Sequence, residues 1–185
     1  MSKLRVMTVV VAVLLAGGVT AAFAQDKLGM SSRKATVDGV VQANEYSYSH
    51  DFDQQITLYA SRTATTLYLS VVANTSGWVA IGVGSPRMDG ADIFMGFVKD
   101  GKVTFKPLVG KGHRHSDAPA DVAASLESYA MKQSGGKTTL EVALKADAYT
   151  KKGQSTLDLI FAMGDQASFT QYHSYRGATS LTLAE

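Results

Sequence analysis

Residues 77–93 read Gly77-Trp-Val-Ala-Ile-Gly-Val-Gly-Ser-Pro-Arg-Met-Asp-Gly-Ala-Asp-Ile93, and this stretch decides the fold. The first half, up to Gly84, is short and almost wholly apolar, as expected of a buried strand. A Ser-Pro-Arg segment then interrupts the run and predicts a tight loop, which carries Met88. A second apolar run begins at Asp92, so the stretch predicts two consecutive strands joined by this loop.

Short strand signals recur along the rest of the chain, and no long helical periodicity competes with them. The candidate strands are Lys34–Val37, Ile56–Arg62, Thr66–Ala73, Trp78–Val83, Ile93–Lys99, Val103–Leu108, Ser125–Gln133, Lys137–Leu144, Leu157–Met163 and Phe169–Tyr175. Many short strands separated by turns predict an all-β protein, an immunoglobulin-like antiparallel β-sandwich of about nine to eleven strands.

Two of these strands alternate apolar and polar residues, which places one face of each in the core. The apolar faces are Leu67, Leu69 and Val71 in the first strand and Leu140, Val142 and Leu144 in the second. Glu141 and Lys145 are expected to point away from that core.

The connections carry turn signals of different strength. Lys99-Asp-Gly-Lys102 is a two-residue hairpin signal, and Ser134-Gly-Gly-Lys137 predicts another hairpin. Asp147 to Gly153 is compatible with a short helical turn. Residues 110–124 are the only long irregular segment, and loops of that length in a compact domain are usually functional or mobile.

The first 24 residues have the pattern of a secretory signal peptide. Lys3 and Arg5 form a basic start, Val6 to Leu15 is apolar, and Ala22-Phe-Ala24 matches a cleavage site. We expect cleavage after Ala24, with an uncleaved N-terminal anchor as the alternative. Residues 25–185 then form a single domain, and the mature protein is not expected to be integral to a membrane.

Composition excludes several classes of function. Removing Lys3 and Arg5 from the 18 basic residues leaves as many basic residues as the 16 Asp and Glu, so no basic surface argues for nucleic acid. The chain has no cysteine, which excludes disulfides, thiolate zinc sites, iron–sulfur clusters and thioether-linked haem. Any haem would therefore be held without a covalent bond.

Met88 is an unusual residue for a polar loop, because a thioether gains nothing from water but can bind a soft metal or haem iron. A partner for it occurs near the C-terminus, where Ser168-Phe-Thr-Gln-Tyr-His-Ser-Tyr-Arg-Gly177 carries His173. The strand pattern places His173 within a strand. Met and His together form an axial pair for a b-type haem, although each alone also fits an ordinary packing role.

Several motifs of the chain resemble the DOMON domain family, in the order that the family shows. They are Thr36-Val-Asp-Gly39 followed by Glu45-Tyr46, Leu67-Tyr-Leu69, Gly77-Trp-Val-Ala-Ile-Gly82, Met88-Asp-Gly-Ala-Asp-Ile93, and His173-Ser-Tyr-Arg-Gly177 before Leu181-Thr-Leu183. The resemblance covers essentially all of residues 25–185.

This resemblance implies a β-sandwich that binds either haem b or a sugar in a pocket between sheet and loops. The haem-binding cytochrome domain of cellobiose dehydrogenase is similar, and it implies Met88 and His173 as the axial ligands. It also implies that the domain has no enzymatic activity of its own. A domain of this family carries electrons when it holds haem and recognises other ligands when it does not.

Trp78 and Arg176 complete the set of candidate cofactor-binding residues. Arg176 could pair with a haem propionate, because guanidinium suits carboxylates, although an exposed arginine at a strand end is an equal interpretation. Trp78 could stack on a sugar, but a run this apolar also fits a core tryptophan.

Other polar residues give weaker signals. His113 and His115 could bind copper or zinc from an extended segment, but no third ligand is evident, although His50 or Asp117 could lie nearby. An exposed loop is the preferred interpretation of this pair. Asp89 and Asp92 lie close in sequence, yet nothing positions a second carboxylate opposite them for glycosidase chemistry.

The sequence therefore predicts an exported b-type cytochrome, periplasmic or secreted, that transfers single electrons through a six-coordinate haem. With both axial positions filled, the iron would have no open site for oxygen or peroxide. The alternative is a haem-free module that binds a carbohydrate or another small ligand in the same cleft. A membrane cytochrome or a dehydrogenase is the expected redox partner.

Overall fold

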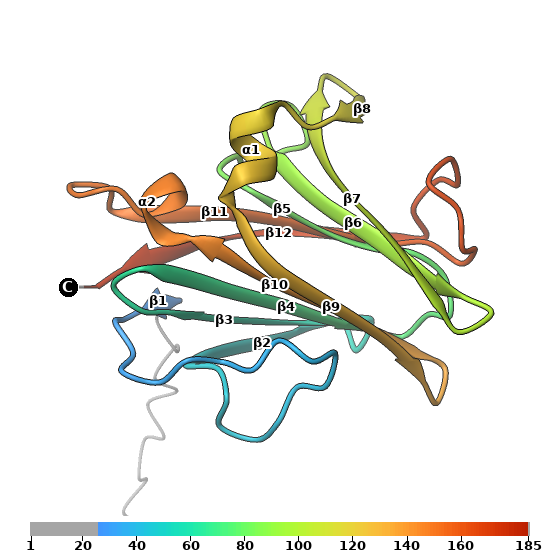
Figure 1. Cartoon of the computed structure of the whole chain (residues 1–185), viewed down its shortest axis with the longest axis horizontal. Coiled ribbons are helices and arrows are strands. Elements are labelled where there is room, and N and C mark those ends of the chain that lie inside the picture. The colour runs from blue at the N-terminus through green and yellow to red at the C-terminus, as the bar shows by residue number, and fades with distance from the viewer. Residues whose placement is uncertain (1–25, 185) are drawn as a thin grey trace, which may run out of the picture.

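The computed structural model describes residues 26–184, so the predicted signal peptide lies outside the described residues. Within that range two β-sheets pack face to face (Figure 1). The strands are β1 (Lys27–Leu28), β2 (Tyr48–Phe52), β3 (Ile56–Arg62), β4 (Thr66–Ala73), β5 (Val79–Val83), β6 (Asp92–Lys99), β7 (Lys102–Lys111), β8 (Arg114–Asp117), β9 (Leu126–Ser134), β10 (Lys137–Lys145), β11 (Thr156–Met163) and β12 (Tyr175–Leu183), and the helices are α1 (Ala120–Ser125) and α2 (Ala146–Tyr149).

The larger sheet has the strand order β1-β12-β11-β5-β6-β7-β8, and the smaller has the order β2-β3-β4-β10-β9. Neighbouring strands are antiparallel except β1 and β12, which are parallel. The predicted all-β sandwich is confirmed. The described residues contain twelve strands, more than the expected nine to eleven, because short edge strands add to those with a clear pattern.

The main core lies between the two sheets and follows the predicted alternation. Leu67, Leu69 and Val71 of β4 are fully buried there, and so are the three leucine and valine residues of β10 that face them. From the larger sheet, β5 contributes Val79 and Ile81. Alternate residues of one strand therefore point into one core, as a period of two requires.

Both predicted hairpin turns are confirmed, and their backbone explains their sequences. Asp100 and Gly101 have φ angles of 52° and 72°, and Gly135 and Gly136 have φ angles of 58° and 76°. Two consecutive left-handed residues define the type I′ turn, which Asp-Gly and Gly-Gly adopt at low cost.

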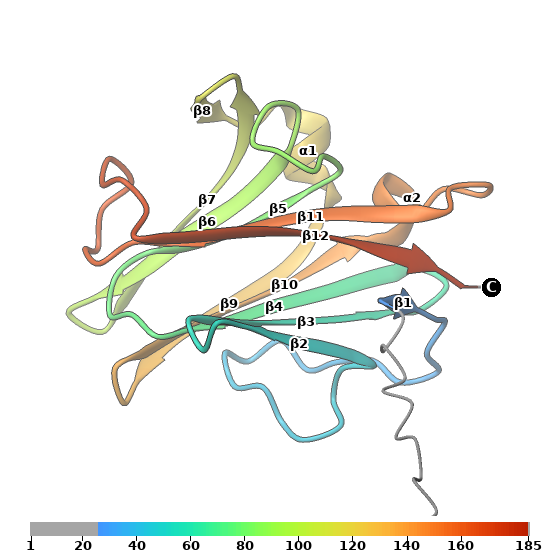
Figure 2. The same cartoon turned by 180° about the vertical axis from the view of Figure 1, so that it is seen from behind.

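The strand predicted at Lys34–Val37 is wrong. These residues lie in an irregular segment that crosses the outer face of the smaller sheet, and we call residues 35–46 the strap. The amide of Thr36 donates to the Glu45 carboxylate at 2.7 Å instead of to a neighbouring strand. Ala35, Val37 and Tyr46 pack on Tyr68 of β4 and on Ala143 of β10. Figure 2 shows the strap in blue below β2 and β3.

The prediction that residues 110–124 are irregular is also wrong in part. Strand β7 continues to Lys111, β8 pairs back onto it, and α1 begins at Ala120. Every side chain of β8 is exposed, so this edge strand has no apolar pattern from which it could be predicted. The helical turn expected near Asp147 is confirmed as α2, which begins one residue earlier. Neither helix within residues 26–184 is long and apolar enough to cross a membrane.

Candidate functional site

The outer face of the larger sheet carries a second apolar cluster, separate from the main core. Its buried members are Trp78, Ala80, Ala91, Ile93, Met95, Phe97 and Leu108. In β5 and β6 these residues alternate with those that point into the main core, so both faces of these strands are apolar. A sheet face of this kind needs a cover, and two loops provide it here.

Met88 lies on the first of these loops, residues 84–91, between β5 and β6. Its side chain is half-buried and packs against the outer cluster. The loop is tied to the end of β7, since the amide of Gly90 donates to the Gly110 carbonyl at 3.1 Å and that of Gly110 donates to the Ala91 carbonyl at 2.9 Å. These bonds fix the Met88 backbone relative to the sheet.

Gly110 has a positioning role that the sequence did not reveal. A Cβ atom at this position would lie 1.7 Å from the Met88 carbonyl oxygen. Only glycine allows the Met88 loop to approach β7 this closely. The sequence shows a glycine at position 110, after an apolar run, but only the fold shows that it packs against the Met88 loop.

We therefore predict that Gly110→Ala displaces the Met88 loop and lowers the free energy of unfolding by about 1–3 kcal/mol, the usual range for forced overpacking. Gly29→Ala is the matched control, because a Cβ there would meet no atom within 4 Å. Urea denaturation of both variants measures the difference. Equal stability of the two variants would show that the loop moves without cost.

His173 lies on the second loop, residues 164–174, between β11 and β12. The prediction that it lies within a strand is wrong: β11 ends at Met163 and β12 begins at Tyr175. The segment folds on itself instead, with the Ser174 hydroxyl donating to the Asp165 carboxylate at 2.7 Å. The alternating pattern that predicted a strand here belongs to a loop, and the pattern alone cannot distinguish the two.

The environment of His173 favours the neutral imidazole. Partial burial, and then the positive charge of Arg176, lower the pKa of His173 below its ordinary value of 6.5. The ring lies against Tyr172, with ring centroids 4.3 Å apart. Neutral imidazole is the form that binds metals.

The two loops leave opposite ends of the paired strands β5 and β11, because Val83 lies opposite Leu159 and Val79 lies opposite Met163. Figure 1 shows the β11–β12 loop, in orange-red, at the end away from α2. Both loops nevertheless contribute to the outer cluster. Met88 joins it from one loop, and Phe169 joins it from the other, with its ring 5.0 Å from that of Phe97. The Met88 loop and the His173 loop therefore reach one apolar face from opposite ends, and Met88 itself packs on the cluster.

Trp78 is buried at the start of β5, with only 5% of its surface exposed. Gly164 packs on it so closely that a Cβ atom there would lie 2.1 Å from the indole Nε1. This position fits the core interpretation of Trp78 rather than an open stacking surface. Its Nε1 has no hydrogen-bond partner among the described residues.

Arg176 is exposed on β12, opposite Ala162 of β11 in the register. Ala162 packs at the border of the outer cluster, so the guanidinium stands beside this face. No carboxylate of residues 26–184 forms an ion pair with it. Arg176 is therefore free to pair with an anionic group bound here.

The remaining polar candidates do not assemble into a site. His113 and His115 are exposed near the β7–β8 turn, His50 is on β2 of the other sheet, and Asp117 pairs with Lys106 at 3.6 Å. Residues 26–184 contain no group of three side chains placed to hold a metal ion.

The two loop aspartates have structural roles, as loop acids often do. The carboxylate of Asp89 accepts a hydrogen bond from the Gly112 amide at 2.8 Å, which ties the Met88 loop to the β7–β8 turn. Asp92 accepts a hydrogen bond from the Tyr149 hydroxyl at 2.9 Å, and burial raises the pKa of this carboxyl. These bonds account for both carboxylates without catalysis.

The residues at the outer cluster fit the chemistry of a haem ligand set. A thioether and an imidazole held neutral are an axial pair, an apolar face suits the porphyrin, and an unpaired arginine suits a propionate. Met88 packs on the cluster, whereas His173 lies on the loop at the opposite end of β5 and β11, so the structure does not bring the two candidate ligands together.

The comparisons with known proteins agree with this reading of the fold. The family described as DOMON domain matches residues 50–164. The cytochrome domain of Myriococcum thermophilum cellobiose dehydrogenase is 14% identical, with a TM-score of 0.52 over 74% of this chain and 81% of that chain. The cytochrome b domain of pyranose dehydrogenase from Coprinopsis cinerea is 9% identical, with a TM-score of 0.55 over 72% of this chain and 80% of that chain.

A carbohydrate-binding module of family 9 from Caldicellulosiruptor kristjanssonii, in complex with cellotriose, shares the same fold. It is 11% identical, with a TM-score of 0.51 over 85% of this chain and 93% of that chain. No curated protein sequence matches this one. The similar structures therefore include both cytochrome and carbohydrate-binding domains.

Proposed function

This chain belongs to the DOMON domain family, and from that premise we propose that it is an exported b-type cytochrome that transfers single electrons. The observation that carries the proposal is the outer apolar face of the larger sheet, covered by one loop with Met88 and another with His173. Met88 packs on this face and His173 lies on the loop at its other end, and neither the cluster nor the loops require a methionine or a histidine at these positions.

Each residue has a defined part in this proposal. His173 would bind the iron through its neutral imidazole, which its low pKa keeps available. Met88 would bind the iron through its thioether, which favours ferrous iron and raises the reduction potential. Bound haem would supply a one-electron couple between ferric and ferrous iron.

The protein around the ligands would hold them and exclude water. The hydrogen bonds from Gly90 and Gly110 hold the Met88 loop, and the Ser174–Asp165 bond holds the His173 loop. The buried Trp78 and Phe97 provide the apolar surface beneath them. Arg176 would pair with a propionate and so orient the porphyrin.

The setting of this function follows from the sequence. The signal-peptide pattern of residues 1–24 supports a location in the periplasm or outside the cell. A cytochrome with both axial positions filled exchanges electrons with another protein, and we infer that a membrane cytochrome or a dehydrogenase is its redox partner.

We predict that the full chain, expressed with haem available, is purified as a red protein with a low-spin b-type spectrum. Acid acetone should extract the haem, because no cysteine can bind it covalently. The measurement is the reduced-minus-oxidised spectrum together with the haem-to-protein ratio. A colourless protein that does not take up added hemin would contradict the proposal and favour the carbohydrate-binding alternative.

A further inference from the structure

The strap over the smaller sheet is held by a buried carboxylate. Glu141 of β10 is fully buried, and it accepts hydrogen bonds from the amides of Asp38 and Gly39 at 3.0 and 2.6 Å and from the Tyr46 hydroxyl at 2.7 Å. Charge-assisted bonds of this kind are among the strong ones. They fix the Asp38–Gly39 turn and the Tyr46 end of the strap to one point of the sheet.

Two further contacts make the strap a rigid wall. The Glu45 carboxylate accepts hydrogen bonds from the amides of Thr36 and Gln42, at 2.7 and 2.8 Å, and so joins the two halves of the strap. Gly39 has a φ angle of 85°, and a Cβ there would lie 3.0 Å from the Lys132 Cβ. The strap therefore packs directly against β9.

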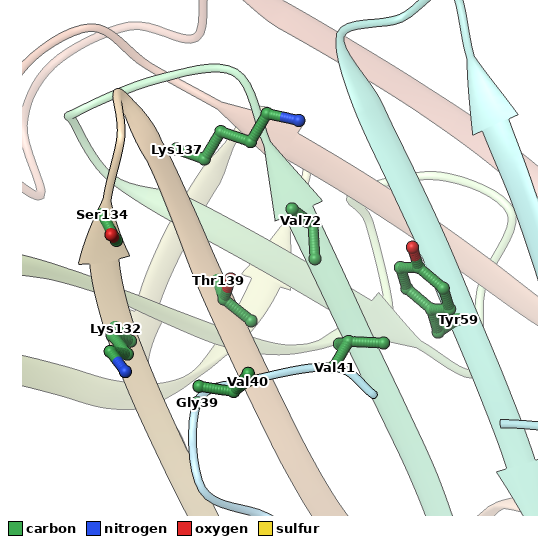
Figure 3. Close-up of a pocket in the computed structure, with 9 residues that line it drawn as sticks. All are labelled: Gly39, Val40, Val41, Tyr59, Val72, Lys132, Ser134, Lys137 and Thr139. Atoms are coloured by element: carbon green, nitrogen blue, oxygen red, sulfur yellow. The ribbon is translucent and has the colours of Figure 1, made fainter. Parts of the chain in front are cut away.

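A cavity of about 320 Å³ lies between this wall and the sheet. Its floor comes from adjacent strands, because Lys132 of β9 lies opposite Thr139 of β10, which in turn lies opposite Val72 of β4. Figure 3 shows the strap residues Val40 and Val41 along one side of the cavity. The complete lining is Gly39, Val40, Val41, Tyr59, Val72, Lys132, Ser134, Lys137 and Thr139.

The charge of this lining has one sign. Lys132 and Lys137 are exposed, and neither forms an ion pair with any carboxylate of residues 26–184. No acidic side chain lines the cavity. Glu141 is two residues along β10 from Thr139, but its carboxylate is buried and already accepts three hydrogen bonds.

A smaller cavity of about 240 Å³ adjoins the first, and Val41 and Tyr59 line both. The additional lining residues are Gln42, Ala43, Asn44, Tyr46 and Ser49. The rings of Tyr46 and Tyr59 are 5.7 Å apart. Together the two cavities form a groove that has amides and hydroxyls around two aromatic rings at one end and two ammonium groups at the other.

We propose that this groove is a ligand site for an acidic sugar, distinct from the face that carries Met88 and His173. Hydroxyl, amide and tyrosine groups suit a polyhydroxylated ring, which has polar edges and an apolar face. Lys132 and Lys137 suit its carboxylate. The rigid strap keeps the groove formed without a ligand, which reduces the ordering cost of binding.

The test is calorimetric titration of the full chain with trigalacturonate, with maltotriose as the neutral control and triglutamate as an acidic control without sugar rings. We expect saturable binding of trigalacturonate alone. The double variant Lys132→Met with Lys137→Met should bind about tenfold more weakly, because it keeps the aliphatic stems but removes both charges. Lys99→Met with Lys102→Met removes the same charge from the β6–β7 turn and should bind as wild type does.

Four results would overturn the proposal. The first is the absence of trigalacturonate binding. The second and third are binding of maltotriose or of triglutamate as tight as that of trigalacturonate. The fourth is an equal loss of trigalacturonate affinity in the two double lysine variants. The same titration with Met88→Ala should match wild type, whether or not that variant holds haem, so this site is tested independently of the proposed cytochrome function.

Discussion

His173→Ala is expected to take up almost no haem, whereas Met88→Ala should keep haem with an altered spectrum and a lower reduction potential. Imidazole binds both ferric and ferrous iron well, so its removal takes away the stronger axial donor. Loss of the thioether leaves one strong ligand and removes the preference for ferrous iron. Hemin titration, the haem-to-protein ratio and a potentiometric titration measure these effects.

The matched control for His173→Ala is the double variant His113→Ala with His115→Ala. Both histidines are exposed near the β7–β8 turn. The haem content of the double variant should therefore stay within a few per cent of wild type, and its free energy of unfolding within about 0.5 kcal/mol. If His173→Ala kept a wild-type spectrum while the double variant lost haem, the axial ligand would lie near β8. The Met88–His173 assignment would then be wrong.

Glu141→Ala is expected to lower the free energy of unfolding by about 3 kcal/mol. The change leaves the buried amide of Gly39, and the part-buried amide of Asp38 and hydroxyl of Tyr46, without their acceptor. Each buried donor left unpaired costs about 1–3 kcal/mol. Loss of the buried carboxylate itself offsets part of that cost. Urea denaturation measures the effect, and Glu127→Ala, an exposed glutamate of β9, is the control.

Glu141 also predicts a pH dependence with a definite sign. Burial raises the pKa of this carboxyl above its ordinary value of 4.5. The folded state therefore binds the proton more tightly than the unfolded state, and stability falls as the pH rises from 4.5 through the raised pKa. Glu141→Gln removes this contribution, so the stability difference between wild type and this variant should shrink with rising pH. A difference independent of pH would show that Glu141 has an ordinary pKa.

The sequence predicted those parts of the fold in which a local pattern reflects burial. The alternation in β4 and β10 and the two type I′ turns are of this kind. Exposed edge strands have no such pattern, which is why β2 and β8 were missed. The strap was mistaken for a strand at Lys34–Val37, because its apolar residues pack against the outside of a sheet rather than within one.

The site was predictable to a different degree. Met88 and His173 could be named from residue type and family resemblance, but the position of their loops at opposite ends of β5 and β11 follows only from the strand register. The burial of Glu141 could not be predicted, since alternation only places it on the side of the sheet away from the core. The role of Gly110 depends on contact with a loop some twenty residues away in sequence, which no local pattern encodes.

The pairing of β5 with β11 has a consequence for the order of folding. Most neighbouring strands are consecutive in sequence and can pair early, but β5 and β11 are separated by five other strands in sequence. Such non-local pairs form slowly, because the chain must close a long loop before the contact stabilises it. The parallel pair of β1 with β12 joins strands from opposite ends of the described chain. The outer face of β5 and β11, which the Met88 and His173 loops border from opposite ends, is therefore completed late, and binding of any ligand to it is expected to follow folding of the sandwich rather than to guide it.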